Sequence, residues 1–372
     1  MKIFVLTSEL NYRNGLGRYS VDMVEAMRSG GVDVSVATAF NGVNDTPTET
    51  LNILPKALDY RSSYLFAIWI AWKLRGHAKD SDLIHSFSEQ YSYIAYWLSK
   101  MTGKKFFITA HGTWAVEPFT TSFIKRYFHR KSFESALKVI CVSSYTKERL
   151  EAYGLHNLCV INNGINFAKF TKAPLPNWSE RENFIVTVGN LKNRKGYHVS
   201  IQAFAKAQGR INDLRYCIVG DQSDKAYLDK LEKLALSLGV RDKIEFLQHI
   251  SDEELVGIYR KAKMFVLTSI SEGSHFEGFG LVYLEANACG LPVVGSLESG
   301  AQDAITSDTG FLVRQGDSQA VAEAIEKIVG DDKLAEAISE KAVEWAEKHD
   351  MSKVAQEYRR LYESGSLNKI DK

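Results

Sequence analysis

The chain contains, in succession, Phe276-Glu277-Gly278-Phe279-Gly280-Leu281-Val282-Tyr283-Leu284-Glu285-Ala286-Asn287-Ala288-Cys289-Gly290-Leu291-Pro292-Val293-Val294. The short apolar runs Met264–Leu267, before this segment, and Pro292–Val294, at its end, are typical of strands buried on both faces of a parallel sheet. Between them, a glycine-rich turn leads into a helix that carries Glu285, with Glu277 at the mouth of the turn. The segment therefore predicts a strand–helix–strand unit.

The same alternation of strands and helices continues over the whole chain. Further strand candidates are Ile3–Leu6, Val34–Ala37, Leu83–Ser86, Lys105–Thr109, Lys138–Val142, Ile185–Val188, Tyr216–Val219 and Ile244–Leu247. Helical patterns lie between them, at 17–27, 144–153, 197–206 and 225–238, and helices follow at 318–329, 333–348 and 351–362. Such alternation predicts an α/β fold of doubly wound parallel sheets.

The length of 372 residues indicates two domains. Residues 171–180 hold two prolines, lack an apolar period and precede a new strand, which is typical of an interdomain linker. We therefore predict one Rossmann-like domain over 1–173 and another over 174–351.

The composition excludes several classes of protein. With 46 basic and 45 acidic residues the net charge is +1, which argues against a nucleic-acid binder. The four cysteines form no C-x-x-C pair and indicate reduced, cytosolic thiols. The N-terminus lacks the pattern of a signal peptide, and the longest apolar run, 64–72, is too short to span a bilayer. We expect a cytoplasmic protein.

Two strand-to-helix junctions carry features of anion sites. Gly15 and Gly17, after the first strand, permit a tight turn at a helix N-terminus, although a plain glycine loop explains them as well. After Val188, three cations gather where a helix begins: Lys192, Arg194 and Lys195. Cations oppose the positive end of the helix dipole, so a bound diphosphate would explain them; a solvated basic loop is the alternative.

The third junction is the quoted segment. Glu277 is expected to face a cleft, with Glu285 two turns further along the same helix face. Carboxylates accept hydrogen bonds from sugar hydroxyls, but a spacing of eight residues is common by chance.

In their setting, Glu277 and Glu285 resemble the Glu-x7-Glu signature of retaining glycosyltransferases of family 4, which have the GT-B fold. The likeness extends over almost the whole chain. Further segments that follow the order of the family are residues 14–17, 142–150, 160–166, 219–221, 244–247 and 256–262.

The resemblance implies two Rossmann-like domains that face each other across a cleft. The N-terminal domain would bind the acceptor, the C-terminal domain would bind a nucleoside-diphosphate sugar, and a C-terminal helix at about 352–372 would pack back on the N-terminal domain. Glu277 would contact hydroxyls of the donor sugar, and Glu285 those of the ribose. Lys195 and Arg194 would neutralise the leaving diphosphate.

The family also assigns the remaining site residues. His111, after a first-domain strand, matches a histidine beside the donor sugar, and Leu247 would border the base. The other donor-binding positions are Gly15, Gly17, Asn190, Asp221, Phe279, Gly280 and Leu281. The chain departs from the family in three places: Asn190 stands where arginine is common, residues 299–302 replace the usual Gly-Gly-x-Pro-Glu turn, and residues 271–276 form a longer approach to Glu277.

The resemblance implies transfer of a sugar, with retention and a front-face displacement, to a glycan or lipid-linked acceptor in cell-surface polysaccharide or lipopolysaccharide synthesis. A nucleotide-sugar epimerase and a non-catalytic sugar-nucleotide binding protein are the alternatives. Asp80-Ser81-Asp82 resembles a metal-binding Asp-x-Asp, but it precedes the strand Leu83–Ser86 and so lies at the amino end of the sheet. We predict no obligatory metal or cofactor.

Two apolar segments of the first domain bear on membrane contact. Residues 64–73 are aromatic and apolar, and residues 119–133 interleave aromatic and basic side chains. The second segment fits a basic amphipathic helix on the inner face of a membrane, or a core helix with a solvated basic face. Both interpretations stay open, and the base, sugar, acceptor and oligomeric state are not identified.

Overall fold

The computed structural model describes residues 1–12, 14–41, 50–55 and 64–367, and it divides the chain into two compact units. The first unit contains Met1–Gly164 and the chain from Met351 onward, and the second contains Ile165–Asp350. The chain thus passes from one unit to the other at 164/165, nine residues before the predicted 173/174 boundary, and returns at 350/351.

The first unit is built on a seven-stranded parallel sheet in the order β3-β2-β1-β4-β5-β6-β7. Its strands are β1 (Lys2–Leu10), β2 (Asp33–Asn41), β3 (Thr50–Asn52), β4 (Leu83–Ser86), β5 (Lys105–Ala110), β6 (Lys138–Cys141) and β7 (Leu158–Val160). Its helices are α1 (Gly15–Ser29), α2 (Tyr64–Lys79), α3 (Ser92–Thr102), α4 (Thr113–Val116), α5 (Phe123–Ser135), α6 (Ser144–Glu151) and α15 (Met351–Leu367), with 3₁₀ turns η1 (Glu89–Tyr91) and η2 (Glu117–Thr120).

The second unit has a six-stranded parallel sheet in the order β10-β9-β8-β11-β12-β13. Its strands are β8 (Phe184–Val188), β9 (Arg215–Val219), β10 (Ile244–Leu247), β11 (Met264–Val266), β12 (Val293–Ser296) and β13 (Gly310–Val313). Its helices are α7 (Phe167–Phe170), α8 (Tyr197–Gln208), α9 (Lys225–Ser237), α10 (Asp252–Lys261), α11 (Leu281–Ala288), α12 (Ala301–Ala304), α13 (Ser318–Val329) and α14 (Asp332–Lys348), with 3₁₀ turns η3 (Trp178–Glu180), η4 (Asn193–Lys195) and η5 (Arg241–Lys243).

Both sheets reverse their strand order once. The reversal lies between β1 and β4 in the first unit and between β8 and β11 in the second. In open α/β sheets, ligands bind outside the carboxyl ends of the strands at this switch point. The fold therefore directs attention to the loops that follow β1 and β4, and to those that follow β8 and β11. The predicted doubly wound α/β architecture is confirmed.

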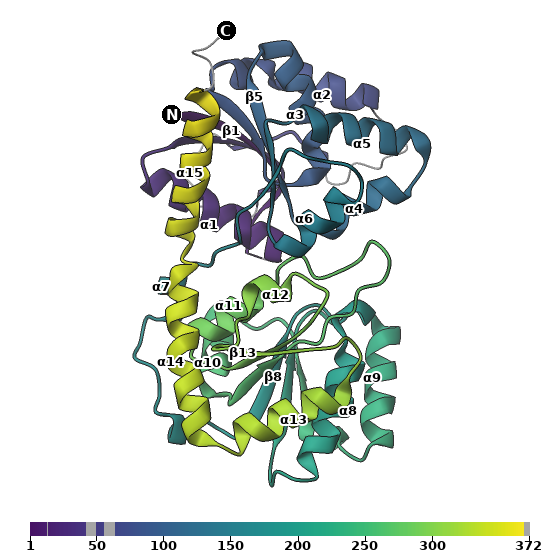
Figure 1. Ribbon diagram of the computed structural model, residues 1–372, viewed down its shortest axis with the longest axis vertical. Coiled ribbons are helices and arrows are strands. Elements are labelled where there is room, and N and C mark those ends of the chain that lie inside the picture. The colour runs from purple at the N-terminus through teal and green to yellow at the C-terminus, as the bar shows by residue number, and fades with distance from the viewer. Residues whose placement is uncertain (13, 42–49, 56–63, 368–372) are drawn as a thin grey trace. The chain divides into compact units, whose positions relative to one another are not determined.

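The C-terminal helix α15 packs on the first unit, as predicted, and it lies beside α1 in Figure 1. Its residues Tyr358 and Tyr362 are fully buried there. The Tyr362 hydroxyl lies 2.5 Å from Nδ1 of His85 on β4, and the Tyr19 hydroxyl of α1 donates to that of Tyr358 at 3.2 Å. The end of the chain thus completes the core of the N-terminal unit.

Residues 171–180, the predicted linker, belong to the second unit. Trp178 is buried and donates from Nε1 to Asp332 at 2.9 Å. The neighbouring Arg181 is buried too, and its guanidinium donates to carbonyl oxygens of Arg260, Ala262 and Cys289. An unpaired buried guanidinium is very costly, so these carbonyls fix the segment against α10 and α11.

The sequence missed three strands: β3, β7 and β13. Each has three or four residues, and each has half-buried positions rather than the continuous burial of central strands. β3 and β7 are the two edges of the first sheet and β13 is an edge of the second. Edge strands need less apolar sequence than central ones, and this is why their signal is weak.

Candidate functional site

The two loops at the switch point of the second unit meet through one ion pair. Lys195 lies in η4, after β8, and its Nζ is 2.5 Å from Oε2 of Glu277, which lies in the loop between β11 and α11. Both side chains are largely buried. The structure therefore brings together two predicted site residues that are 82 positions apart in the chain.

A close backbone approach fixes these two loops. Gly196, which caps the N-terminus of α8, has φ +69°, and a Cβ atom on it would lie 1.8 Å from the carbonyl oxygen of Thr268. The Thr268 hydroxyl donates to the Gly196 carbonyl at 2.8 Å. Only glycine fits this position, and the contact places Lys195 beside the loop that carries Glu277.

Three polar groups set the charge state of Glu277. Burial by itself raises the pKa of this carboxyl, but the cations of Lys195 and Arg194 and hydrogen bonds from Lys195 and Ser269 outweigh it and hold the pKa below its usual value. The Ser269 hydroxyl donates to Oε2 at 3.0 Å. Glu277 is therefore an ionised hydrogen-bond acceptor at neutral pH.

Glu285 is not arranged as predicted. Glu277 precedes the first residue of α11 by four positions, so the two carboxylates do not share a helix face. Glu285 lies in the second turn of α11, is 4% exposed, and accepts a hydrogen bond from the Tyr259 hydroxyl of α10 at 3.3 Å. The glycine-rich turn ends at Gly280, one residue before the helix, and this is why the shared face does not form.

The loop after β8 is also tied to the loops after β9 and β10. The N–H of Gly189 donates to Val219 O, that of Leu191 to Asp221 O, and that of Gly220 to Leu247 O, at 2.9, 3.0 and 2.9 Å. The predicted residues Asn190 and Asp221 are exposed there, and Leu247 is half-buried. Four carboxyl-terminal loops of one sheet, after β8, β9, β10 and β11, therefore form a continuous wall.

The first turn of α11 adds a helix N-terminus to this wall. Gly280, with φ +87°, caps the helix and Leu281 is its first residue. Phe279, just before this cap, is buried, and its ring centre lies 6.4 Å from that of His349. The first N–H groups of a helix have no intrahelical partner and favour an anion.

The longer approach to Glu277 is an ordered turn. Glu272 and His275 exchange backbone hydrogen bonds at 2.8 and 2.9 Å, with Gly273 at φ +61° between them. The Glu272 carboxylate accepts from Nδ2 of Asn193 at 2.8 Å, so the turn is attached to the loop that carries Lys195.

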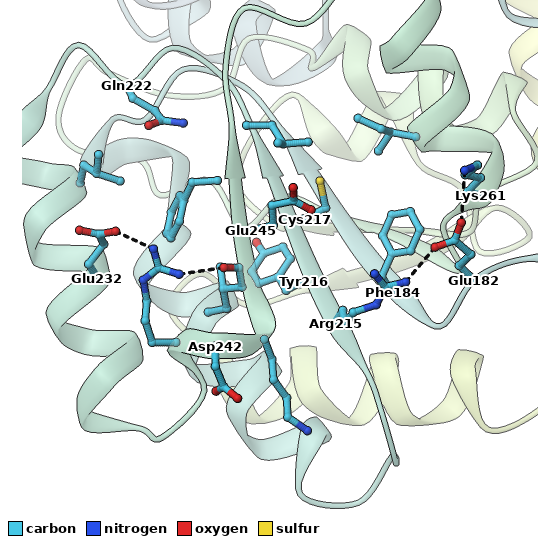
Figure 2. Close-up of a pocket in the computed structure, with 17 residues that line it drawn as sticks. Glu182, Phe184, Arg215, Tyr216, Cys217, Gln222, Glu232, Asp242, Glu245 and Lys261 are labelled. Atoms are coloured by element: carbon cyan, nitrogen blue, oxygen red, sulfur yellow. Dashed lines mark hydrogen bonds and ion pairs between the residues drawn. The ribbon is translucent and has the colours of Figure 1, made fainter.

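The same unit contains a pocket of about 710 Å³ beside the edge strand β10. Figure 2 shows Gln222 at one end of this pocket and the ion-paired residues Glu182 and Lys261 at the other. Leu247 lines the pocket, so the cavity reaches the carboxyl ends of the strands.

In the first unit, Gly15 and Gly17 form the first turn of α1. The side chain of Asn14 caps this helix by accepting from the N–H of Gly17 at 2.9 Å. A Cβ on Gly17 would lie 2.4 Å from Asn11 O, whereas nothing lies within 4 Å of the same position on Gly15. Gly17 is thus required by packing, and Gly15 faces open space.

His111 follows β5 and is held through both its ring and its backbone. Its Nε2 lies 2.8 Å from the carbonyl oxygen of Phe87, which can only accept, so Nε2 carries the proton and Nδ1 has the free lone pair. Burial lowers the pKa of His111 to about 4, partly offset by the hydrogen bond to Phe87. His111 is therefore a neutral imidazole that can accept a proton or a hydrogen bond at Nδ1.

Sequence reasoning missed Glu89, the residue that holds His111 in place. Glu89 follows β4, is almost fully buried, and accepts from the backbone N–H of His111 at 3.3 Å and from that of Ala115. Burial raises its pKa to about 7, although these N–H groups lower it. No motif surrounds Glu89, and only the adjacency of β4 and β5 brings it to His111.

Asp80-Ser81-Asp82 connects α2 to β4. Asp82 accepts from the N–H of Lys2, the first residue of β1, at 2.8 Å. The motif therefore lies at the amino end of the sheet, as predicted from its position before Leu83. Within the described ranges, no three histidine, cysteine or acidic side chains lie close enough together to hold a metal ion. Among the helices of those same ranges, none is long and apolar enough to cross a bilayer.

Comparison with known families accounts for most of the chain. Residues 13–169 match the model of "Glycosyltransferase Family 4", and residues 170–345 match that of "Glycosyl transferases group 1". The two matches meet at 169/170, close to the passage between the structural units.

Among curated proteins, the chain is similar to the GDP-mannose-dependent α-(1-6)-phosphatidylinositol monomannoside mannosyltransferase of Mycolicibacterium smegmatis. The two are 31% identical over 220 residues, which are 56% of this chain and 57% of the relative. The chain spans about half the length of the first curated relatives it matches.

Two solved structures cover nearly all of it. A glycosyltransferase from Rickettsia africae has a TM-score of 0.82 at 20% identity, with 99% of both chains covered. Anabaena HepE in complex with UDP and glucose has a TM-score of 0.78 at 21% identity, covering 98% of this chain and 100% of HepE. Together with the two parallel-sheet units, these likenesses show the predicted GT-B fold.

The Lys195–Glu277 pair predicts a pH-dependent loss of stability in Lys195→Met, which removes the cation but keeps the length of the side chain. In the wild type the pKa of Glu277 is lower in the folded chain than in the unfolded chain, where it is about 4.3. Ionised Glu277 therefore stabilises the fold above pH 4.3, and this stabilisation is lost as the pH falls through the folded pKa. Without Lys195, burial raises that pKa, so stability should fall as pH rises through it. We expect a loss of about 3 kcal/mol in unfolding free energy at pH 8, and much less at pH 5, by urea denaturation.

The matched control is the double variant Lys195→Met/Glu277→Gln, which leaves no buried charge and should recover most of the loss at pH 8. Wild type and Lys195→Met with parallel stability curves between pH 5 and pH 8 would contradict the pairing.

Proposed function

The chain belongs to the family 4 type of glycosyltransferases, since the family 4 model and the group 1 model together match residues 13–345, and on that premise we propose that it transfers a sugar from a nucleoside-diphosphate donor to an acceptor hydroxyl. The observation that carries the proposal is the buried Lys195–Glu277 pair at the switch point of the second sheet. It supplies a cation for a phosphate and an ionised acceptor for sugar hydroxyls in the same place.

The leaving diphosphate is stabilised by positive charge on one wall of the second unit. Lys195 and Arg194 offer two cations, and the helices that begin at Tyr197 and Leu281 point their N-termini toward the same loops. Electrostatic stabilisation of this kind is usually the largest contribution an enzyme makes where charge grows in the transition state.

The two carboxylates take different parts in binding the donor. Glu277 accepts hydrogen bonds from hydroxyls of the transferred sugar, because it is ionised and already lies beside the phosphate cation Lys195. Glu285 accepts those of the ribose, with the Tyr259 hydroxyl orienting its carboxylate.

We propose that the reaction retains the anomeric configuration through a front-face displacement. In this reaction the bond from the anomeric carbon to the phosphate oxygen breaks while the acceptor oxygen attacks from the same side. The acceptor proton passes to the departing phosphate. His111, neutral and with Nδ1 as an acceptor, orients a sugar hydroxyl and is not the acid that protonates the leaving group.

Relatives support a glycan or glycolipid acceptor. The mycobacterial relative is named for a phosphatidylinositol mannoside acceptor and for GDP-mannose, and HepE was solved with UDP and glucose. These names support a nucleoside-diphosphate sugar as donor and a sugar-bearing lipid as one class of acceptor for this chain.

Release of nucleoside diphosphate from a panel of sugar nucleotides, with and without acceptor glycolipids, tests the assignment. We expect Lys195→Met and Glu277→Gln to lower kcat/KM about a hundredfold or more, because each removes a group that acts on the transition state. Lys233→Met is the matched control: Lys233 is exposed on α9, away from the site, and its loss should change kcat/KM by less than about threefold. Equal losses in all three variants, or none, would refute the assignment.

An inverted anomeric centre in the product, seen by NMR, would refute retention alone.

We further propose that the acceptor is met at an anionic membrane surface through α5. Phe123, Ile124 and Tyr127 on this helix are 71%, 61% and 53% exposed, while its other face buries His129 and Phe133. Basic residues flank the exposed side chains, among them Arg126, whose guanidinium lies 5.9 Å from the centre of the Phe123 ring. Aromatic and aliphatic residues surrounded by cations are typical of helices that lie on anionic lipid.

Co-sedimentation with vesicles checks this contact. The chain should bind vesicles that contain phosphatidylglycerol more tightly than pure phosphatidylcholine, and less tightly as salt increases. Phe123→Ser/Ile124→Ser should lower binding at least about fivefold. The control, Leu236→Ser/Leu238→Ser, removes exposed leucines of the second unit and should have no effect. Binding that ignores lipid charge, or that the control lowers equally, would refute the contact.

A further inference from the structure

In the described part of the second unit, one buried side-chain amide nitrogen lacks a hydrogen-bond partner. Gln222 stands three residues after the end of β9, is 7% exposed, and its Nε2 makes no hydrogen bond to any described residue. Buried side-chain polar groups are hydrogen-bonded in the great majority of cases, so an exception calls for an explanation.

The side chain of Gln222 lines one end of the 710 Å³ pocket, and Figure 2 shows it there, apart from the ion pairs of Glu182 at the other end. Leu228 of α9 and Leu247 of β10, both half-buried, line the same pocket. The charged residues Glu232 and Arg241 also line the pocket, but they are paired with each other at 2.8 Å, whereas Nε2 of Gln222 is left without a partner among the described residues.

Backbone hydrogen bonds connect this place to the phosphate cations. Asp221, next to Gln222, accepts from Leu191 of the loop that carries Lys195, and Gly220 donates to Leu247. A diphosphate on Lys195 would therefore place its nucleoside toward the loops after β9 and β10, where Gln222 lies.

We propose that Gln222 reads the base of the donor by donating a hydrogen bond to the carbonyl oxygen at position 4 of a pyrimidine or position 6 of a purine. Uracil carries a carbonyl at position 4 and guanine at position 6, whereas cytosine and adenine carry an amino group there. An amino group donates and does not accept, so it would leave the amide N–H unpaired. The donor is accordingly a uridine or guanosine diphosphate sugar. This inference rests on the proposed function, which does not itself specify the base.

A ligand-facing role and a structural role of Gln222 predict opposite effects of Gln222→Leu on stability. If the amide serves the ligand, its loss removes an unsatisfied polar group, and the melting temperature of the free protein should stay the same or rise. If it holds the fold, the melting temperature should fall.

Calorimetric titration of the full chain with UDP, CDP, GDP and ADP tests the proposal. We expect wild type to bind UDP at least tenfold more tightly than CDP, or GDP at least tenfold more tightly than ADP. Gln222→Leu should weaken the preferred ligand about tenfold and leave the amino-base ligand within twofold. Gln208→Leu, a glutamine at the end of α8, is the matched control and should change neither.

Three results would overturn the inference. Wild type could bind CDP or ADP as tightly as its keto counterpart, or Gln222→Leu could keep the full preference or melt at a lower temperature. Any of these three results would leave the proposed function intact, provided that Lys195→Met still weakens the binding of the nucleoside diphosphates. If wild type binds none of the four nucleotides, the proposed function fails and this inference fails with it.

Discussion

The buried ion pair between Lys195 and Glu277 is the interaction on which the candidate site depends. Desolvating two charges costs several kcal/mol each, so such a pair persists only where geometry and further hydrogen bonds offset that cost. Here Ser269 supplies a further hydrogen bond, Arg194 a second cation, and the contact of Gly196 with Thr268 fixes the distance between the loops. The pair also stands at the strand-order reversal, where the sheet leaves room for a ligand.

In the first unit, the position of His111 depends on α15, a helix from the far end of the chain. Tyr358 of α15 accepts a hydrogen bond from Tyr19, whose ring packs 4.6 Å from that of His111. Tyr362 reaches His85, and His85 in turn lies 2.9 Å from the Thr109 hydroxyl on β5, the strand that leads to His111. The C-terminal helix is therefore a structural wall behind His111, and Glu89 holds its backbone. Because these contacts bury His111, its pKa is lowered and its imidazole is neutral.

Much of the fold was predictable because central parallel strands are buried on both faces and read as continuous apolar runs. The central strand Leu83–Ser86 has the predicted bounds, and 318–329 forms the predicted helix. The edge strand Ile244–Leu247 also has its predicted bounds, because three of its four residues are apolar even though it is partly exposed. The edge strands β3, β7 and β13 were missed because half-exposed strands lack that run. The passage between units lies at 164/165 and not near the prolines, because Trp178 and Arg181 are anchored in the second unit.

Of the site, sequence motifs identified the residues but not their arrangement. Lys195 and Glu277 were chosen from separate junctions, and only the pairing of β8 with β11 shows that they touch. Glu89 and Gln222 carry no pattern that distinguishes them from surface residues, and their burial is a property of the folded unit.

The central claim is that Lys195 is shared between Glu277 and the donor phosphate. Calorimetric affinities of Glu277→Gln for a nucleoside diphosphate and for its sugar nucleotide test it most directly. The variant frees Lys195 from its carboxylate and removes the ionised acceptor of the sugar. It should therefore bind the nucleoside diphosphate at least as tightly as wild type, and the sugar nucleotide about tenfold less tightly or worse. Equal weakening of both ligands would contradict the claim, because the carboxylate would then be supporting the loops and not sharing the lysine.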